Sequence, residues 1–144
     1  MKKDHIRDYA TDAFRFYAKS GGKDNYIKYL MDDISRNKGS GVCNPTEAAL
    51  VSKEKIIESR AAEFADIAAV DKVMVILDNS HQGYYIKKAI EYVYFKDCDE
   101  DIAKGEISDR IHYCEIHIPA SERQIYYWLK KARTLFAEER GLRF

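Results

Sequence analysis

The sequence predicts an all-α protein. Apolar residues recur every three or four positions in successive segments, which is the spacing of a helix with one buried face. The 144 residues contain only two prolines and seven glycines, too few to separate many short strands. Helix-starting and helix-ending residues flank several of these segments. We expect an N-terminal helical region over residues 1–43, followed over residues 44–144 by a long central helix and a C-terminal helix-turn-helix domain.

Composition indicates a folded globular chain, since 46% of the residues are hydrophobic and 33% are charged. The longest apolar run, residues 73–77, is far shorter than the ~20 residues needed to cross a bilayer, so no membrane partner is expected. Residues 1–5 lack the apolar stretch of a secretory signal, and we expect a cytoplasmic protein. Cys43, Cys98 and Cys114 lack disulfide-framework spacing and are expected as free thiols.

The N-terminal half predicts two helices and then a long helical stretch. The first covers residues 4–19 and ends at Gly21-Gly22, and the second covers residues 23–36. Asn44-Pro45-Thr46-Glu47 is a typical helix start, and residues 46–78 then predict one long helix or two consecutive ones. The β-branched run 73–77 is also compatible with a buried strand, although its helical context favours a helix.

The second half predicts three further helices. One covers residues 82–95 and is followed by an acidic loop over 96–101. A short helix over 105–113, with Ile107 and Ile111 as its apolar pair, precedes a connection over 112–120. This connection is longer than the three or four residues of a tight helix-turn-helix.

The last predicted helix covers residues 121–140 and has two distinct faces. Ser121 and Gln124 have capping-box spacing at its start, and Gly141 ends it. One face is apolar and is expected to be buried; it contains Ile125, Trp128, Leu129, Ala132, Leu135 and Phe136. Trp128 is therefore predicted to be a core residue and not a base-stacking one.

The opposite face of this helix carries the predicted DNA contacts. Residues 122–144 contain six Lys/Arg against three Glu, so basic charge gathers here although the formal net charge is zero. A recognition helix needs such a face, whose first residues enter the major groove deepest. The predicted DNA-binding residues are Ser121, Glu122, Arg123, Gln124, Tyr126, Tyr127, Lys130, Lys131 and Arg133. Arg123, Gln124, Tyr126 and Tyr127 are candidates for base or groove contacts, and Lys130, Lys131 and Arg133 for phosphate contacts.

Three segments resemble a family of transcription proteins: residues 84–95, Lys104-Gly105-Glu106-Ile107-Ser108, and Ala120–Arg133. They are similar to the region-four helix-turn-helix of sigma factors, and more narrowly to phage-encoded sigma-factor-like regulators of the ArpU and RinA type. The resemblance covers roughly residues 44–144. It implies control of phage or prophage genes at promoter DNA, with a Gram-positive bacterium as the expected host. Nothing matches the promoter-melting region of sigma factors, so an autonomous sigma factor is not expected.

Several alternatives stay open at this stage. The basic face of residues 121–140 is also compatible with a helix that is simply solvated and binds nothing. A metal site is a second alternative, since side chains with ligand atoms occur at His112, Cys114, His117 and Cys98, although they lack the paired spacing of a zinc motif. Tyrosines in the N-terminal half fit either a core or a surface for homodimer or RNA polymerase contact. Rival functions are the small subunit of a phage DNA-packaging terminase and a protein-interaction module without DNA binding. We predict no enzyme, no catalytic or metal-binding residue and no cofactor.

Overall fold

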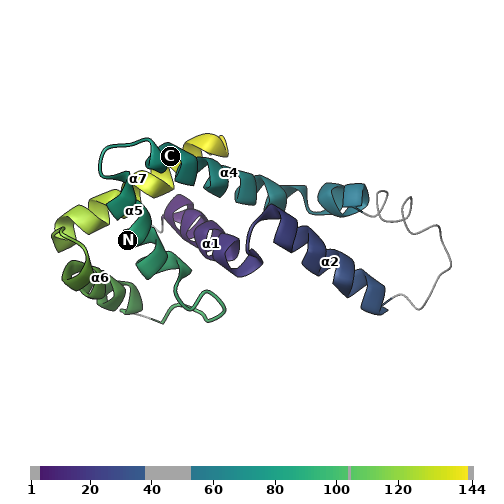
Figure 1. The fold of residues 1–144 in the computed structure, drawn as a ribbon, viewed down its shortest axis with the longest axis horizontal. Helices are drawn as coiled ribbons and strands as arrows, with labels where there is room; N and C mark the ends of the chain where they lie inside the picture. Colours follow the sequence, from purple (N-terminus) through teal and green to yellow (C-terminus); the bar gives the residue numbers. More distant parts are fainter. Residues whose placement is uncertain (1–3, 38–52, 104, 143–144) are drawn as a thin grey trace.

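The computed structural model describes residues 4–37, 53–103 and 105–142, and within these ranges the chain contains helices and no strand. This confirms the all-α prediction. In chain order (Figure 1) the elements are α1 (His5–Ser20), α2 (Lys23–Asn37), α4 (Ala61–Asp78), α5 (Gly83–Ile90), the π-helical turn η1 (Glu91–Phe95), α6 (Glu106–His117) and α7 (Glu122–Glu139). Residues 53–59 are also helical and end at a turn before α4.

The first two helices lie where the sequence predicts them. Asp4 begins α1 by accepting a hydrogen bond from the Arg7 backbone N–H at 2.9 Å. Gly21 ends it in the left-handed region, with φ of 75°, where its own N–H bonds to the Tyr17 carbonyl. Two local signals therefore set both ends of α1 to within one residue of the prediction.

The run 73–77 is helical and forms the second half of α4, as the helical context predicted. Val73 and Leu77 are fully buried. The predicted stretch 46–78 is interrupted at Arg60, so it contains consecutive helices over its described part. The predicted start at residues 44–47 and the boundary at residue 43 lie outside the described residues.

The predicted helix over 82–95 divides into α5 and η1. Gly83 permits a close approach at its start, because a Cβ there would lie 1.6 Å from the Leu77 carbonyl oxygen. The wider π-helical turn then carries Val93 and Tyr94 into the core. The acidic loop follows at Lys96, as predicted.

The sequence prediction is wrong about the helix before α7. α6 continues to His117 instead of ending at residue 113, and only residues 118–121 connect it to α7. Two contacts stabilise the extra turn. On its core side Cys114 is fully buried, and on its exposed side the His117 ring lies against the Tyr113 ring with centroids 4.2 Å apart. The connection thus has four residues and is not the long segment predicted.

The main core joins α1 to the last five elements, α4 to α7 with η1 among them. Ala10, Ala13 and Phe14 of α1 pack with buried residues of α4, α5, η1, α6 and α7. Phe14 stacks on Tyr94 and contacts Phe136, with ring centroids 5.7 and 5.9 Å apart. α2 and the start of α4 extend away from this bundle in Figure 1 and share a smaller core around Tyr26 and Phe64. None of the helices in the described ranges has the length and apolarity to cross a membrane.

Two buried arginines fix the segment between η1 and α6. Arg15 of α1 donates to the backbone carbonyls of Tyr94 at 3.3 Å, of Asp97 at 2.9 Å and of Glu100. Arg110 of α6 donates to the Val93 carbonyl at 2.7 Å and to Glu106 at 2.9 Å. The positive guanidinium groups thereby bond to the carbonyls of Val93 and Tyr94 at the end of η1, and Arg15 also ties the following loop to α1.

Candidate nucleic-acid interface

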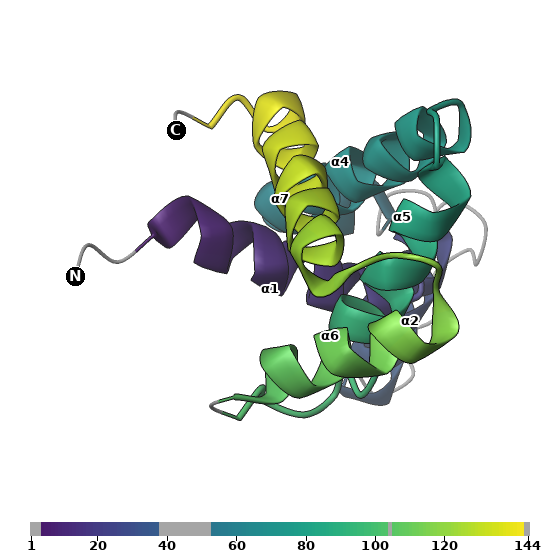
Figure 2. The ribbon, with the colours of Figure 1, turned by 90° about the vertical axis from the view of Figure 1, so that its left-hand side faces the viewer.

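α6, its short connection and α7 form one packed unit. Arg110, Ile111 and Cys114 of α6 are buried, and Ile118 of the connection is 4% exposed. Ser121 then begins α7, its hydroxyl oxygen accepting from the Gln124 N–H at 3.2 Å. Figure 2 shows α6 running crosswise below the N-terminal end of α7, with the connection looping between them. A four-residue connection is within the range of helix-turn-helix motifs.

The two faces of α7 are divided as the sequence predicts. The inward face is fully or partly buried and comprises Ile125, Trp128, Leu129, Ala132, Leu135 and Phe136. Trp128 is 3% exposed, which confirms that it is a core residue. Burial of this apolar stripe fixes the orientation of α7, so its other stripe faces outward.

Most of the predicted DNA-binding residues lie on that outward stripe. Ser121, Arg123, Tyr126, Tyr127, Lys130 and Lys131 are exposed, whereas Glu122, Gln124 and Arg133 are half-buried. The Tyr127 ring is the more open of the two tyrosines, at 66% exposure against 43% for Tyr126. The α7 face, as we call this set from Ser121 to Arg133, carries four cations, Arg123, Lys130, Lys131 and Arg133, against one carboxylate, Glu122.

Arg133 has a second, structural contact. Its Nη1 donates to the Tyr94 hydroxyl at 2.8 Å, which ties the middle of α7 to η1. Its guanidinium is therefore held in place beside the groove between α1 and α7. A phosphate contact by Arg133 would come from a group already positioned by the core.

The sequence reasoning missed one cation beside the α7 face. Arg7 of α1 lines the same groove as Lys130 and Arg133. The groove broadens toward Tyr126 into a cavity of about 610 Å³, where the acidic Asp8 and Asp12 also line the wall. No local pattern could place Arg7 there, because the contact joins helices from opposite parts of the chain.

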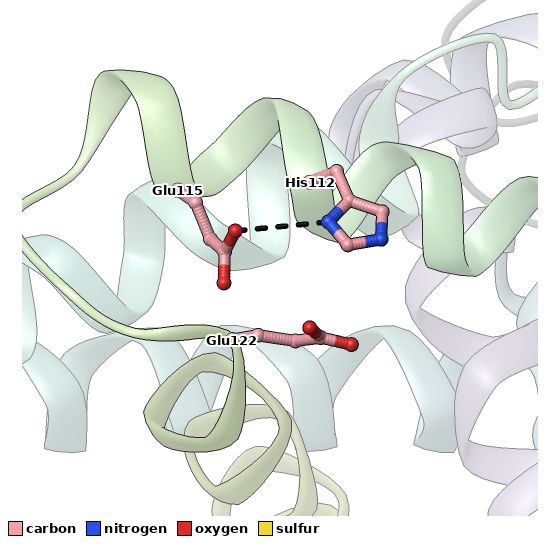
Figure 3. Close-up of side chains that lie close together, drawn as sticks. All are labelled: His112, Glu115 and Glu122. Atoms are coloured by element: carbon pink, nitrogen blue, oxygen red, sulfur yellow. Dashed lines mark ion pairs between the residues drawn. The ribbon is translucent and has the colours of Figure 1, made fainter.

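Carboxylates lie at the other end of the α7 face. Glu122, at the first position of α7, points toward Glu115 and His112 of α6 (Figure 3). The His112 Nδ1 lies 3.6 Å from the Glu115 Oε2. Glu115, Glu122 and Arg123 line one shallow hollow together with Ser121 and Tyr126.

The structure does not gather the metal-ligand residues considered from the sequence. Cys114 faces the core, where burial raises the pKa of its thiol to about 11. Within the described residues, His112 instead comes together with Glu115 and Glu122, whose ligand atoms all lie within 4.8 Å of one another. The sequence signal that could have suggested this set is the i, i+3 spacing of His112 and Glu115, which is too common to single out.

Comparison of the chain with protein-family models, with curated proteins and with solved structures gave no match.

Proposed function

We propose that the protein binds double-stranded DNA sequence-specifically through the α7 face and regulates transcription. The observation that carries the proposal is the arrangement of α7 itself. Its apolar stripe is buried in the core, while Arg123, Tyr126, Tyr127, Lys130 and Lys131 remain open on the other side. A helix anchored in this way presents side chains to a major groove at low entropic cost.

The chemistry of the face divides along its length. Arg123 and Gln124 lie in the first turn, and their side chains are the types that pair with the edges of guanine and adenine. Lys130 and Lys131 lie two turns farther on, where ammonium groups neutralise phosphates without reading sequence. Tyr126 and Tyr127 lie between these groups and can contact groove walls through both ring and hydroxyl.

A local patch is needed because the whole chain carries no net charge. The 24 Lys/Arg equal the 24 Asp/Glu in number, so long-range attraction to DNA is weak. Arg7 and Arg133 add two cations along the groove beside α7, where Asp4, Asp8 and Asp12 also line the wall. Binding of this kind depends on contacts made by one helix and is sensitive to single substitutions.

The promoter setting rests on the sequence resemblance to sigma region four and to phage regulators, which includes residues 120–133. On that basis the expected targets are promoters of phage or prophage genes. The four-residue connection between α6 and α7 supports the proposal, because tight helix-turn-helix motifs have turns of three or four residues.

The test is selection of bound sequences from a random duplex pool, followed by titrations with the selected site. Arg123→Ala is expected to weaken that site about 5- to 150-fold and to relax the preference at one base pair. Lys131→Ala should weaken all duplexes alike and reduce the salt slope by about 0.9. Lys28→Ala, an exposed lysine of α2, is the control and should change neither quantity. Absence of any bound duplex at low salt would refute the proposal.

A further inference from the structure

The convergence of His112, Glu115 and Glu122 is unexplained by packing. The three side chains come from the outer face of α6 and the first residue of α7 and point into one gap (Figure 3). Side-chain exposure is 56% for His112 and 34% for Glu115, so neither side chain is needed to fill the core. Within the described residues, Glu122 has no ion-pair partner within 4.0 Å. Two carboxylates therefore share a small space with a single imidazole.

We infer that these three residues form a binding site for a divalent transition-metal ion of the Zn²⁺ class, joining α6 to α7. One imidazole nitrogen and two carboxylate oxygens form a ligand set that Zn²⁺ accepts, with water completing four-coordination. Ions such as Mg²⁺ favour six oxygen ligands and are less suited to the imidazole.

The distances permit this ligation without a change of backbone. Ligands at about 2.0–2.1 Å from a tetrahedral Zn²⁺ lie roughly 3.4 Å from each other. The His112 and Glu115 ligand atoms are already 3.6 Å apart. All three ligand atoms lie within 4.8 Å of one another. Rotation of the Glu122 side chain is therefore enough to bring its carboxylate oxygen to the ligand–ligand distance of a bound ion.

Neighbouring residues hold the backbone of the three ligands in place. Ile111 and Cys114, which directly precede His112 and Glu115 in α6, are fully buried. Glu122 directly follows the Ser121 cap of α7. The N-terminus of α7 carries a partial positive charge of about half an elementary charge, which would repel a cation. The two carboxylates together carry about four times that charge with the opposite sign, so the net effect is attraction.

The site also bears on DNA binding, and this second step rests on the proposed function. Glu115 and Glu122 line the same hollow as Arg123 and Tyr126. Without a cation, their two negative charges oppose a phosphate or base edge that approaches Arg123. A bound divalent cation neutralises them and holds the first turn of α7 against α6. Metal occupancy is therefore expected to strengthen DNA binding about fivefold or more.

The metal site is tested on the full chain without DNA, by calorimetric titration with Zn²⁺. Wild type should bind Zn²⁺ at this site, and His112→Ala, Glu115→Gln and Glu122→Gln should each weaken that binding tenfold or more. His81→Ala and Glu138→Gln change the same residue types at other exposed positions and should leave it unchanged. Circular dichroism and the Tm of the metal-free variants identify any that fail to fold, in which case the remaining two decide. Unchanged binding in every folded variant, or no Zn²⁺ binding below about 100 μM, would overturn the site.

The DNA step has a separate readout. With a selected duplex, Zn²⁺ should raise the affinity of wild type. Metal-free Glu122→Gln should already bind more tightly than metal-free wild type and should not respond to Zn²⁺. Zn²⁺ binding with no effect on DNA affinity overturns the coupling and leaves the metal site standing. Absence of DNA binding in all proteins refutes the proposed function and leaves the Zn²⁺ titration unaffected.

Discussion

Replacing Arg15 with Met tests how a buried cation holds the acidic loop. Methionine keeps much of the apolar stem but removes the guanidinium, which donates to the carbonyls of Tyr94, Asp97 and Glu100. Hydrogen bonds from charged donors contribute roughly 1.5–3 kcal/mol each. Asp97 and Glu100 are exposed residues whose carbonyls regain water, whereas the Tyr94 carbonyl stays buried. We expect the free energy of unfolding to fall by about 3 kcal/mol.

Urea denaturation measures this loss. With a urea dependence of about 2 kcal/mol/M, a change of about 3 kcal/mol lowers the midpoint by roughly 1.5 M. Arg7→Met is the matched control, because Arg7 lies on the same helix, has a side chain 56% exposed and pairs with the exposed carboxylate of Asp8. It should change stability by less than about 0.5 kcal/mol. Equal midpoints for the two variants would refute the assignment of Arg15 as the support of this loop.

Two further substitutions test close packing and a half-buried phenol. Gly83→Ala should lower the free energy of unfolding by about 3 kcal/mol, because the new Cβ would collide with the Leu77 carbonyl and α5 would have to shift. The Tm is then expected to fall by roughly 5 °C or more. A Tm within about 2 °C of wild type would contradict the close approach. Burial, and then the hydrogen bond to Asp71, raises the pKa of Tyr17 to about 12. The folded state therefore keeps a proton that the unfolded chain loses near pH 10, so this contribution to stability is complete below about pH 10 and is lost as the pH rises toward 12. Thermal midpoints between pH 9 and 12 should fall less steeply for Tyr17→Phe than for wild type, and parallel curves would argue against the shift.

Sequence patterns predicted the elements whose limits depend on nearby residues. The start of α1 at Asp4 and the start of α7 at Ser121 follow from single capping side chains. The two faces of α7 follow from the spacing of its apolar residues, among them Trp128 and Phe136. These features need no knowledge of which helices are neighbours.

The errors concern features set by distant contacts. α6 extends to His117 because Cys114 finds a place in a core built by other helices. The π-helical form of residues 91–95 likewise depends on the burial of Val93 and Tyr94. A periodicity argument treats each segment alone and therefore does not detect such tertiary support.

The candidate site divides in the same way. Arg123, Tyr127 and Lys131 share one helix, and their common exposure could be predicted from spacing. Arg7, which comes beside Lys130 through the packing of α1 on α7, could not. Nor could the approach of Glu122 to His112 and Glu115, which requires the four-residue connection to turn α7 back across α6.

The contact between Phe14 and Phe136 affects how the chain folds during its synthesis. These rings pack together although about 120 residues separate them in the sequence. α1 therefore lacks this neighbour until the segment that forms α7 has been translated. Until α7 emerges from the exit tunnel, the apolar faces of α1 and α4 that pack against it stay exposed. A ribosome stalled before α7 has left the tunnel would carry a nascent chain with an unfinished core, open to proteases and chaperones.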